Sequence, residues 1–242
     1  MTGYAIPIVA LDVPTAGDAL ALARRLSEDC HFFKVGSTLY TAAGPNIVRE
    51  LRERLGADVF LDLKFHDIPT TVEGAVRSAA ALGARLISVH ASGGLEMLRA
   101  AREGAGHQCG VLGVTVLTSH DDASLAASWG RESVSVEDEV LRLASDAVAV
   151  GLHGIVCSGA EVEAVNAVHG DRLALLVPGI RLAGEDANDQ RRVVTPHAAQ
   201  RAGARYVVLG RTVTAAADPR AAFRRVLVDL AADTVDGLPA MG

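Results

Sequence analysis

Short apolar runs rich in β-branched residues alternate with longer amphipathic stretches along this chain, and the alternation repeats eight times. The runs have the length of buried strands and are bounded by glycine, proline and polar residues. Strands that alternate with helices are parallel, and eight such units favour a closed barrel over an open sheet. The expected fold is therefore an α/β structure, a (β/α)8 TIM barrel. The predicted strands are 6–12, 32–36, 59–64, 86–90, 110–117, 154–157, 173–178 and 206–209.

The amphipathic stretches, such as 16–27, 45–55 and 72–82, are typical of helices that cover a barrel. Thr15, Ser92 and Thr195 are the expected N-cap residues of three of the helices. The length of 242 residues fits one barrel, which typically has about 250. No charged or Pro/Gly/Ser-rich linker divides the chain. We therefore predict a single domain at 1–235 and a flexible tail at 236–242.

The composition supports this fold and argues against two kinds of site, a nucleic-acid surface and a metal centre. Half of the residues are hydrophobic but only 4% are aromatic, so Val, Leu, Ile and Ala must fill the core, as in parallel sheets covered by helices. The formal charge of −6 argues against nucleic acid as a partner, although a few local cations can still bind a small anion. The histidines and the three cysteines lack metal-ligand spacing, so no metal site is predicted.

The N-terminal segment resembles a buried strand rather than a signal peptide. It has no basic region, and Pro7 and Asp12 interrupt its apolar run. No apolar stretch reaches the roughly 18 residues of a membrane span. We expect a soluble, cytoplasmic protein that has no membrane partner and carries its cysteines as thiols.

Nearly every predicted strand ends on a polar or charged residue. In an α/β barrel, the carboxyl ends of the strands form one rim, where the chemistry takes place. These residues are Asp12, Lys34, Asp62 with Lys64, His90, Thr118 with Ser119, Ser158, Arg181, and Gly210 with Arg211.

The densest polar segment is 60–72, which reads FLDLKFHDIPTTV. Asp62 and Lys64 are two residues apart on a strand, so both point to the same face, into the barrel. A buried ion pair with no chemical role is one interpretation of such a pair. The nearby Lys34 and Asp67 make an alternating Lys–Asp–Lys–Asp network the better account, and such networks are typical of functional sites.

A second signal follows the last two strands, where barrels often bind phosphate. The sequences VPGIR at 177–181 and LGR at 209–211 each combine a glycine with an arginine, which suits close backbone approach and a bidentate phosphate contact. Either arginine alone would more often be a solvated surface residue. The polar segment 182–190 is long for a connection and is expected to be a mobile lid, from which Gln190 reaches the ligand.

These motifs resemble the orotidine 5′-monophosphate decarboxylase family in the same order along nearly the whole chain. The matching segments are ALD at 10–12, FKVG at 33–36, LDLKFHDIPTTV at 61–72, VLTS at 116–119, PGIR at 178–181 with Gln190, and VLGR at 208–211. Many members of that family have Asn at the position of Thr70, a small departure.

The resemblance implies decarboxylation of orotidine monophosphate without a metal or cofactor, and it implies a role for each matching residue. Lys64 would be the proton donor, and Asp62, Lys34 and Asp67 would complete the catalytic set. Asp67 and Thr71 would come from the neighbouring subunit of a homodimer with shared active sites. The implied substrate-binding residues are Asp12, Lys34, Asp62, Thr71, Thr118, Ser119, Pro178, Arg181, Gln190, Gly210 and Arg211.

Two other functions are compatible with part of this pattern. Related barrel enzymes that act on sugar phosphates, such as 3-keto-gulonate-6-phosphate decarboxylase and hexulose-phosphate synthase, share the D-x-K-x-x-D motif but use Mg²⁺ and carry Glu at the position of Lys34. A cation at that position would repel Mg²⁺. A nucleotide-binding protein without turnover would be expected to lack one of Asp62, Lys64 and Asp67, and all three are present.

Overall fold

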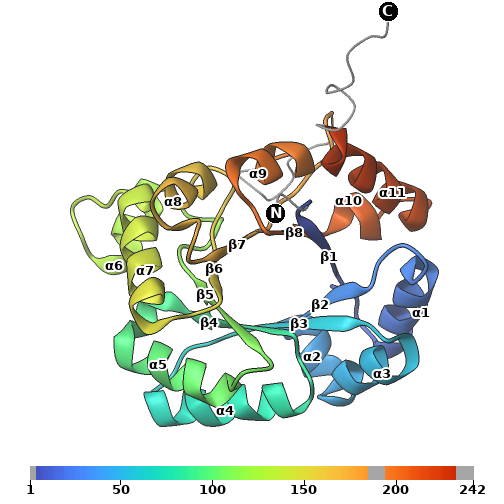
Figure 1. Cartoon of the computed structure of the whole chain (residues 1–242), viewed down its shortest axis with the longest axis horizontal. Coiled ribbons are helices and arrows are strands. Elements are labelled where there is room, and N and C mark those ends of the chain that lie inside the picture. Colours follow the sequence, from blue (N-terminus) through green and yellow to red (C-terminus); the bar gives the residue numbers. More distant parts are fainter. Residues whose placement is uncertain (1–3, 185–193, 233–242) are drawn as a thin grey trace, which may run out of the picture.

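The computed structural model describes residues 4–184 and 194–232. Within these residues, eight parallel strands form a closed barrel in which each strand pairs with the next in sequence and β8 pairs with β1 (Figure 1). The predicted (β/α)8 barrel is confirmed. The strands are β1 (Ile6–Ala10), β2 (Phe32–Gly36), β3 (Asp58–Phe65), β4 (Leu86–His90), β5 (Gly110–Val114), β6 (Gly154–Val156), β7 (Ala174–Val177) and β8 (Tyr206–Leu209).

Helices surround the barrel on its outside (Figure 1). They are α1 (Ala16–Leu26), α2 (Ser37–Ala43), α3 (Asn46–Leu55), α4 (Pro69–Ala81), the 3-10 turn η1 (Ala91–Gly93), α5 (Gly94–Ala105), α6 (Asp122–Trp129), α7 (Val136–Val150), α8 (Val162–His169), α9 (Pro196–Ala202), α10 (Arg211–Thr214) and α11 (Pro219–Leu230). Among the helices in the described part of the chain, none is both long and apolar enough to cross a membrane.

Several predicted boundaries were wrong by a few residues. The fifth strand ends at Val114 instead of residue 117, because its pairing with both neighbours stops there, at His90 of β4 and at Val156 of β6. Thr15 and Thr195 cap α1 and α9 through their side chains, as predicted. Ser92 does not cap a helix, because the chain first makes the turn η1 and α5 then begins at Gly94. The predicted tail at 236–242 lies outside the described residues.

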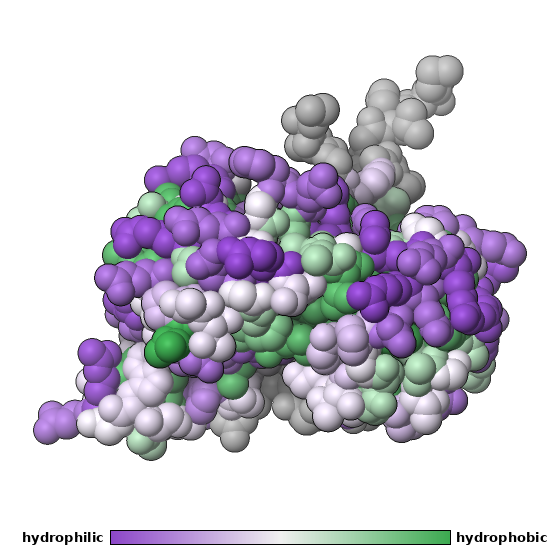
Figure 2. Space-filling view, turned by 90° about the horizontal axis from the view of Figure 1, so that it is seen from below, coloured by the Kyte–Doolittle hydropathy of each residue, from purple (hydrophilic) through white to green (hydrophobic). Residues whose placement is uncertain are grey.

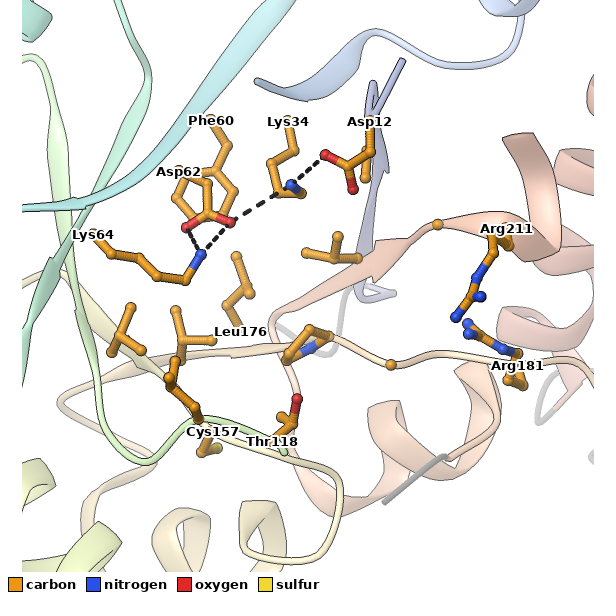
Figure 3. Close-up of a pocket in the computed structure, with 18 of the residues that line it drawn as sticks. Asp12, Lys34, Phe60, Asp62, Lys64, Thr118, Cys157, Leu176, Arg181 and Arg211 are labelled. Atoms are coloured by element: carbon orange, nitrogen blue, oxygen red, sulfur yellow. Dashed lines mark hydrogen bonds and ion pairs between the residues drawn. The ribbon is translucent and has the colours of Figure 1, made fainter. Parts of the chain in front are cut away.

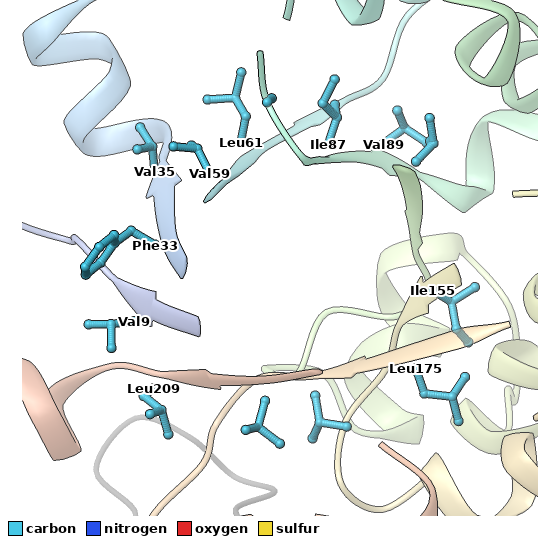
Figure 4. Close-up of a cluster of buried hydrophobic side chains, with 14 of the residues drawn as sticks. Val9, Phe33, Val35, Val59, Leu61, Ile87, Val89, Ile155, Leu175 and Leu209 are labelled. Atoms are coloured by element: carbon cyan, nitrogen blue, oxygen red, sulfur yellow. The ribbon is translucent and has the colours of Figure 1, made fainter. Parts of the chain in front are cut away.

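Side chains alternate along the strands between the barrel interior and the helix layer. The outward-facing ones include Val9, Phe33, Leu61, Ile87 and Leu209, which pack beneath the helices in the larger apolar cluster (Figure 4). The alternate residues form a smaller cluster of their own inside the barrel, and its members are Ile8, Ala10, Phe32, Phe60, Leu86, Leu112, Leu176, Tyr206 and Val208. This alternation aims Lys34, Asp62 and Ser88 into the barrel.

Candidate active site

A cavity of about 440 Å³ opens at the carboxyl ends of the strands. Apolar side chains of the barrel interior line its floor, among them Phe60, Leu176 and Val208. Charged side chains stand on two sides of it: lysines and aspartates from β1 to β3, and arginines from the loops after β7 and β8 (Figure 3). The cavity therefore offers an apolar wall for a flat ring and cationic groups for an anionic ligand.

The lysines and aspartates form a continuous chain of ion pairs (Figure 3). Lys34 Nζ lies 3.0 Å from Asp12 Oδ1 and 3.6 Å from Asp62 Oδ2. Lys64 Nζ donates to both carboxylate oxygens of Asp62 at 2.9 Å. The alternation of charge expected for Lys34, Asp62 and Lys64 is thus present within one chain.

Asp62 is the buried anion at the centre of this chain, with only 9% of the residue exposed. Burial alone would raise the pKa of its carboxyl group, but the charges of Lys64 and Lys34 and hydrogen bonds from Lys64 and Ser88 outweigh burial, and the pKa is lowered. Asp62 therefore stays ionised at neutral pH and holds both ammonium groups near the cavity.

Lys64 has an unusual backbone. Its φ is +52°, and it is the one non-glycine residue in the described part of the chain with a positive φ. A left-handed conformation costs a residue with a side chain roughly 1–2 kcal/mol. The pairing of β3 with β4 shifts register between Leu61 and Phe65, so Lys64 lies in a bulge. Bulges at barrel rims often re-aim an active-site side chain.

Gly36, at the end of β2, leaves room for the ion pair between Lys34 and Asp12. A Cβ atom there would lie 2.9 Å from Lys34 Nζ and 3.1 Å from Asp12 Oδ1, which is too close for an undisturbed pair. The glycine of the FKVG segment thus has a steric reason that the sequence alone did not show.

The opposite end of the cavity is cationic. The guanidinium groups of Arg181, after β7, and Arg211, after β8, approach each other there (Figure 3). Arg181 is buried, and its Nη1 donates to the carbonyl oxygen of Ile180 at 2.8 Å. Gly179, whose φ is +76°, and Gly210 also line this end. Two arginines and the backbone of two glycines at one place suit a phosphate group.

The cavity brings together most of the predicted site residues but not all of them. Its lining includes Asp12, Lys34, Asp62, Lys64, Thr118, Pro178, Arg181, Gly210 and Arg211. Ser119, Asp67 and Thr71 are exposed and do not line it. Asp67 Oδ1 accepts a hydrogen bond from the N–H of Ile68. Gln190 and most of the predicted lid lie outside the described residues.

Two further predicted rim residues have other surroundings. The His90 ring lies 5.3 Å from that of His66, and burial, the nearby His66 and the Lys64 charge lower the His90 pKa. Ser158 is fully buried and donates its hydroxyl to Glu161 at 2.6 Å. Neither His90 nor Ser158 lines the cavity.

Sequence reasoning missed Ser88 and overlooked a signal in the lysines. Ser88 bonds to both Asp62 and Lys64, and as a polar residue between Ile87 and Val89 it stood at an inward-facing position of a predicted strand. Lys34 and Lys64 are the only two lysines in the sequence, and every other basic side chain apart from histidine is arginine. Unlike arginine, lysine carries a compact charge and can release a proton. The restriction of lysine to positions 34 and 64 was therefore a sequence signal that both residues belong to the site.

Comparison with known proteins places this geometry in a family. A family model described as "Orotidine 5'-phosphate decarboxylase / HUMPS family" matches residues 6–226. The chain is 52% identical over 221 residues to an orotidine 5'-phosphate decarboxylase of Anaeromyxobacter dehalogenans, covering 91% of this chain and 96% of that relative. It is 48% identical to the protein of the same name from Sodalis glossinidius, covering 92% and 89% of the two chains.

A solved structure agrees. The crystal structure of orotidine 5'-phosphate decarboxylase from Lactobacillus acidophilus superimposes with a TM-score of 0.82 at 34% identity, covering 94% of this chain and 99% of that one. The family match at residues 6–226 includes all eight strands.

Proposed function

Because this chain belongs to the orotidine 5'-phosphate decarboxylase / HUMPS family, we propose that it converts orotidine 5′-monophosphate to uridine 5′-monophosphate in pyrimidine biosynthesis. The observation that carries the proposal is the chain of ion pairs in which Asp62 lies between Lys34 and Lys64, beside an apolar wall. The reaction needs no cofactor in this proposal.

Lys64 supplies both charge and proton. When the bond between C6 of the pyrimidine and the carboxylate breaks, CO₂ leaves and the electron pair stays on C6. This carbanion has no adjacent electron sink, so a fixed cation nearby is the main means of stabilising it. The ammonium group of Lys64 then donates a proton to C6, and the resulting amine regains a proton from solvent.

The other groups bind and orient the substrate. Asp62 would lie beside the departing carboxylate, where like charges repel, although we assign the larger effect to stabilisation of the carbanion. Arg181 and Arg211 would bind the phosphate, together with Gly210 and Pro178. The ribose would contact Asp12 and Lys34, and Thr118 would contact the pyrimidine.

A metal-dependent sugar-phosphate enzyme is the alternative within the family. Lys34 Nζ argues against it, because the ammonium already lies between the carboxylates of Asp12 and Asp62, where a divalent cation would need to bind. In the proposed decarboxylase, the ammonium group of Lys34 occupies this position and pairs with both carboxylates.

Loss of orotidine monophosphate absorbance should proceed equally well before and after treatment with excess EDTA. The rate is expected to be unchanged within about twofold, since the charge at C6 is met by Lys64 and not by an ion. A Mg²⁺-dependent sugar-phosphate decarboxylase treated in parallel is the control. Abolished activity that Mg²⁺ restores would contradict the metal-free mechanism.

We further propose a homodimer with shared active sites. The segment after β3 projects Asp67 and Thr71 from the surface, and Ile68 between them is 66% exposed. Leu95, Leu117 and Trp129, which follow β4 and β5, are also exposed. Seen from the side on which α4 and α5 lie in Figure 1, the molecule has apolar patches among hydrophilic ones (Figure 2). Exposed apolar side chains after β3, β4 and β5 suit a contact between subunits in which Asp67 completes the partner's site.

Mixing two inactive variants tests the shared site. Lys64→Ala and Asp67→Ala should each be nearly inactive, whereas a mixture that has exchanged subunits should recover about a quarter of wild-type activity, because half of the dimers then contain one intact site. Activity and mass by light scattering are the measurements. A mixture that stays inactive although heterodimers form would show that Asp67 does not act across the interface.

We also propose a cytoplasmic location. Cys30, Cys109 and Cys157 are buried and form no disulfide, which suits a reducing compartment. Burial raises the pKa of Cys30 to about 11 and that of Cys109 to about 12, so these thiols stay protonated and unreactive. Cell fractionation with an antibody to the protein would test the location.

A further inference from the structure

Ser88 bonds to two members of the reactive network at once. It lies in the middle of β4 and is fully buried. Its hydroxyl donates to Asp62 Oδ1 at 2.8 Å and accepts the backbone N–H of Lys64 at 2.9 Å. A hydroxyl has one donor and two acceptor positions, so it can make both bonds together.

The bulge in β3 explains why this position needs a hydroxyl. Leu61 pairs with Ile87 and Phe65 pairs with Val89, so three residues of β3 stand opposite Ser88 alone. The N–H of Lys64 therefore lacks the backbone acceptor that a regular ladder would supply. Ser88 Oγ takes the place of that acceptor, which matters because a buried N–H without a partner is strongly unfavourable.

The same bulge contains the left-handed backbone of Lys64. A conformation this unfavourable persists only where the surroundings hold it. The hydrogen bond from the Lys64 N–H to the Ser88 hydroxyl holds the backbone of the lysine, and the salt bridge to Asp62 holds its ammonium end. Ser88 therefore bonds both to the backbone of Lys64 and to the carboxylate that pairs with its ammonium group.

We infer that Ser88 is a positioning residue for the decarboxylation, whose hydroxyl fixes the left-handed backbone of Lys64 and the carboxylate of Asp62 so that the ammonium group points at the reacting carbon. This inference rests on the proposed function, in which Lys64 carries the proton. Ser88 is fully buried and is not among the residues that line the cavity, so it acts through its two neighbours.

Ser88→Val and Ser88→Thr form the matched test, because their side chains have the same shape and differ in the hydroxyl. We expect Ser88→Thr to keep kcat within about threefold of wild type. Ser88→Val should lose at least about thirtyfold in kcat, with KM changed much less, since a small misplacement of a reacting group costs about 10²-fold in rate.

The acid limb of the pH profile of kcat should also move to higher pH in Ser88→Val, because Asp62 loses a hydrogen bond that stabilises its ionised form. Ser88→Ala, which adds no volume, is the second hydroxyl-free variant.

A readout independent of catalysis is available because the chain has two lysines. Protein labelled with ¹⁵N-lysine gives two backbone amide signals, from Lys34 and Lys64. The Lys64 signal should stay protected from hydrogen exchange in Ser88→Thr and exchange at least about tenfold faster in Ser88→Val and Ser88→Ala. The Lys34 signal is the internal control.

The outcomes separate the two proposals. Equal kcat in Ser88→Val and Ser88→Thr, or an unchanged Lys64 amide in Ser88→Ala, would overturn the role of Ser88. A wild-type protein without activity on orotidine monophosphate would overturn the proposed function, and the amide comparison would still decide whether Ser88 holds the Lys64 backbone.

Discussion

Lys64→Ala should lower the turnover of orotidine monophosphate by at least about 10⁴-fold, since it removes both the cation that stabilises the carbanion and the proton donor. The barrel should remain folded, because the side chain of Lys64 lies at the rim and is 35% exposed. Turnover is measured from the loss of substrate absorbance, and folding from a thermal melt.

Lys64→Arg separates the two roles of the lysine. Arginine keeps the positive charge but does not give up a proton in proteins, so this variant should also be strongly impaired. Retained binding of uridine monophosphate, which lacks the carboxylate, would show that the rest of the site is intact. If Lys64→Ala turns over at a rate near wild type, Lys64 is not the proton donor, and global unfolding of the variant in the melt would mean that Lys64 has a structural role.

Arg211→Ala should lower kcat/KM for orotidine monophosphate by about 10²-fold, because a charge-assisted hydrogen bond contributes up to about 3 kcal/mol. The effect should appear in kcat as well as in KM, since binding energy of the remote phosphate can serve to order the reacting end. Steady-state kinetics with the nucleotide and with orotidine, which lacks phosphate, provide the measurement.

The two substrates and a matched variant give the controls for Arg211. For orotidine, Arg211→Ala and wild type should be equally slow. Arg205→Ala removes an exposed arginine just before β8, at the opposite end of the same strand, and should leave both substrates unaffected. Equal losses for orotidine and the nucleotide in Arg211→Ala would place this arginine outside the phosphate site.

Much of this molecule could be predicted from the sequence because its signals are local. The eightfold repeat of short apolar runs and helical stretches favours strands at those runs, and parallel strands bring their carboxyl ends to one rim. Asp12, Lys34, Asp62, Lys64, Arg181 and Arg211 therefore converge on one cavity as expected. The family resemblance was confirmed, and it rested on those same rim residues.

The features that could not be predicted from the sequence depend on contacts between strands. β5 ends at Val114 because its pairing with β4 and with β6 stops there, and the bulge at Lys64 is visible only in how β3 pairs with β4. Ser88 is one residue of an apolar strand until that bulge places the backbone of Lys64 beside it. Asp67 is exposed and does not line the cavity of its own chain. Its role in the active site of a partner subunit therefore stays a prediction.

Restriction of lysine to positions 34 and 64 bears on how this protein can be handled. Reagents that acylate amines, and solid supports that couple through amines, can react only with the α-amino group and with Lys34 and Lys64, which both line the cavity. Random amine labelling would thus become directed at the pocket, with bound nucleotide as a shield, whereas the arginine-bearing exterior would stay unlabelled.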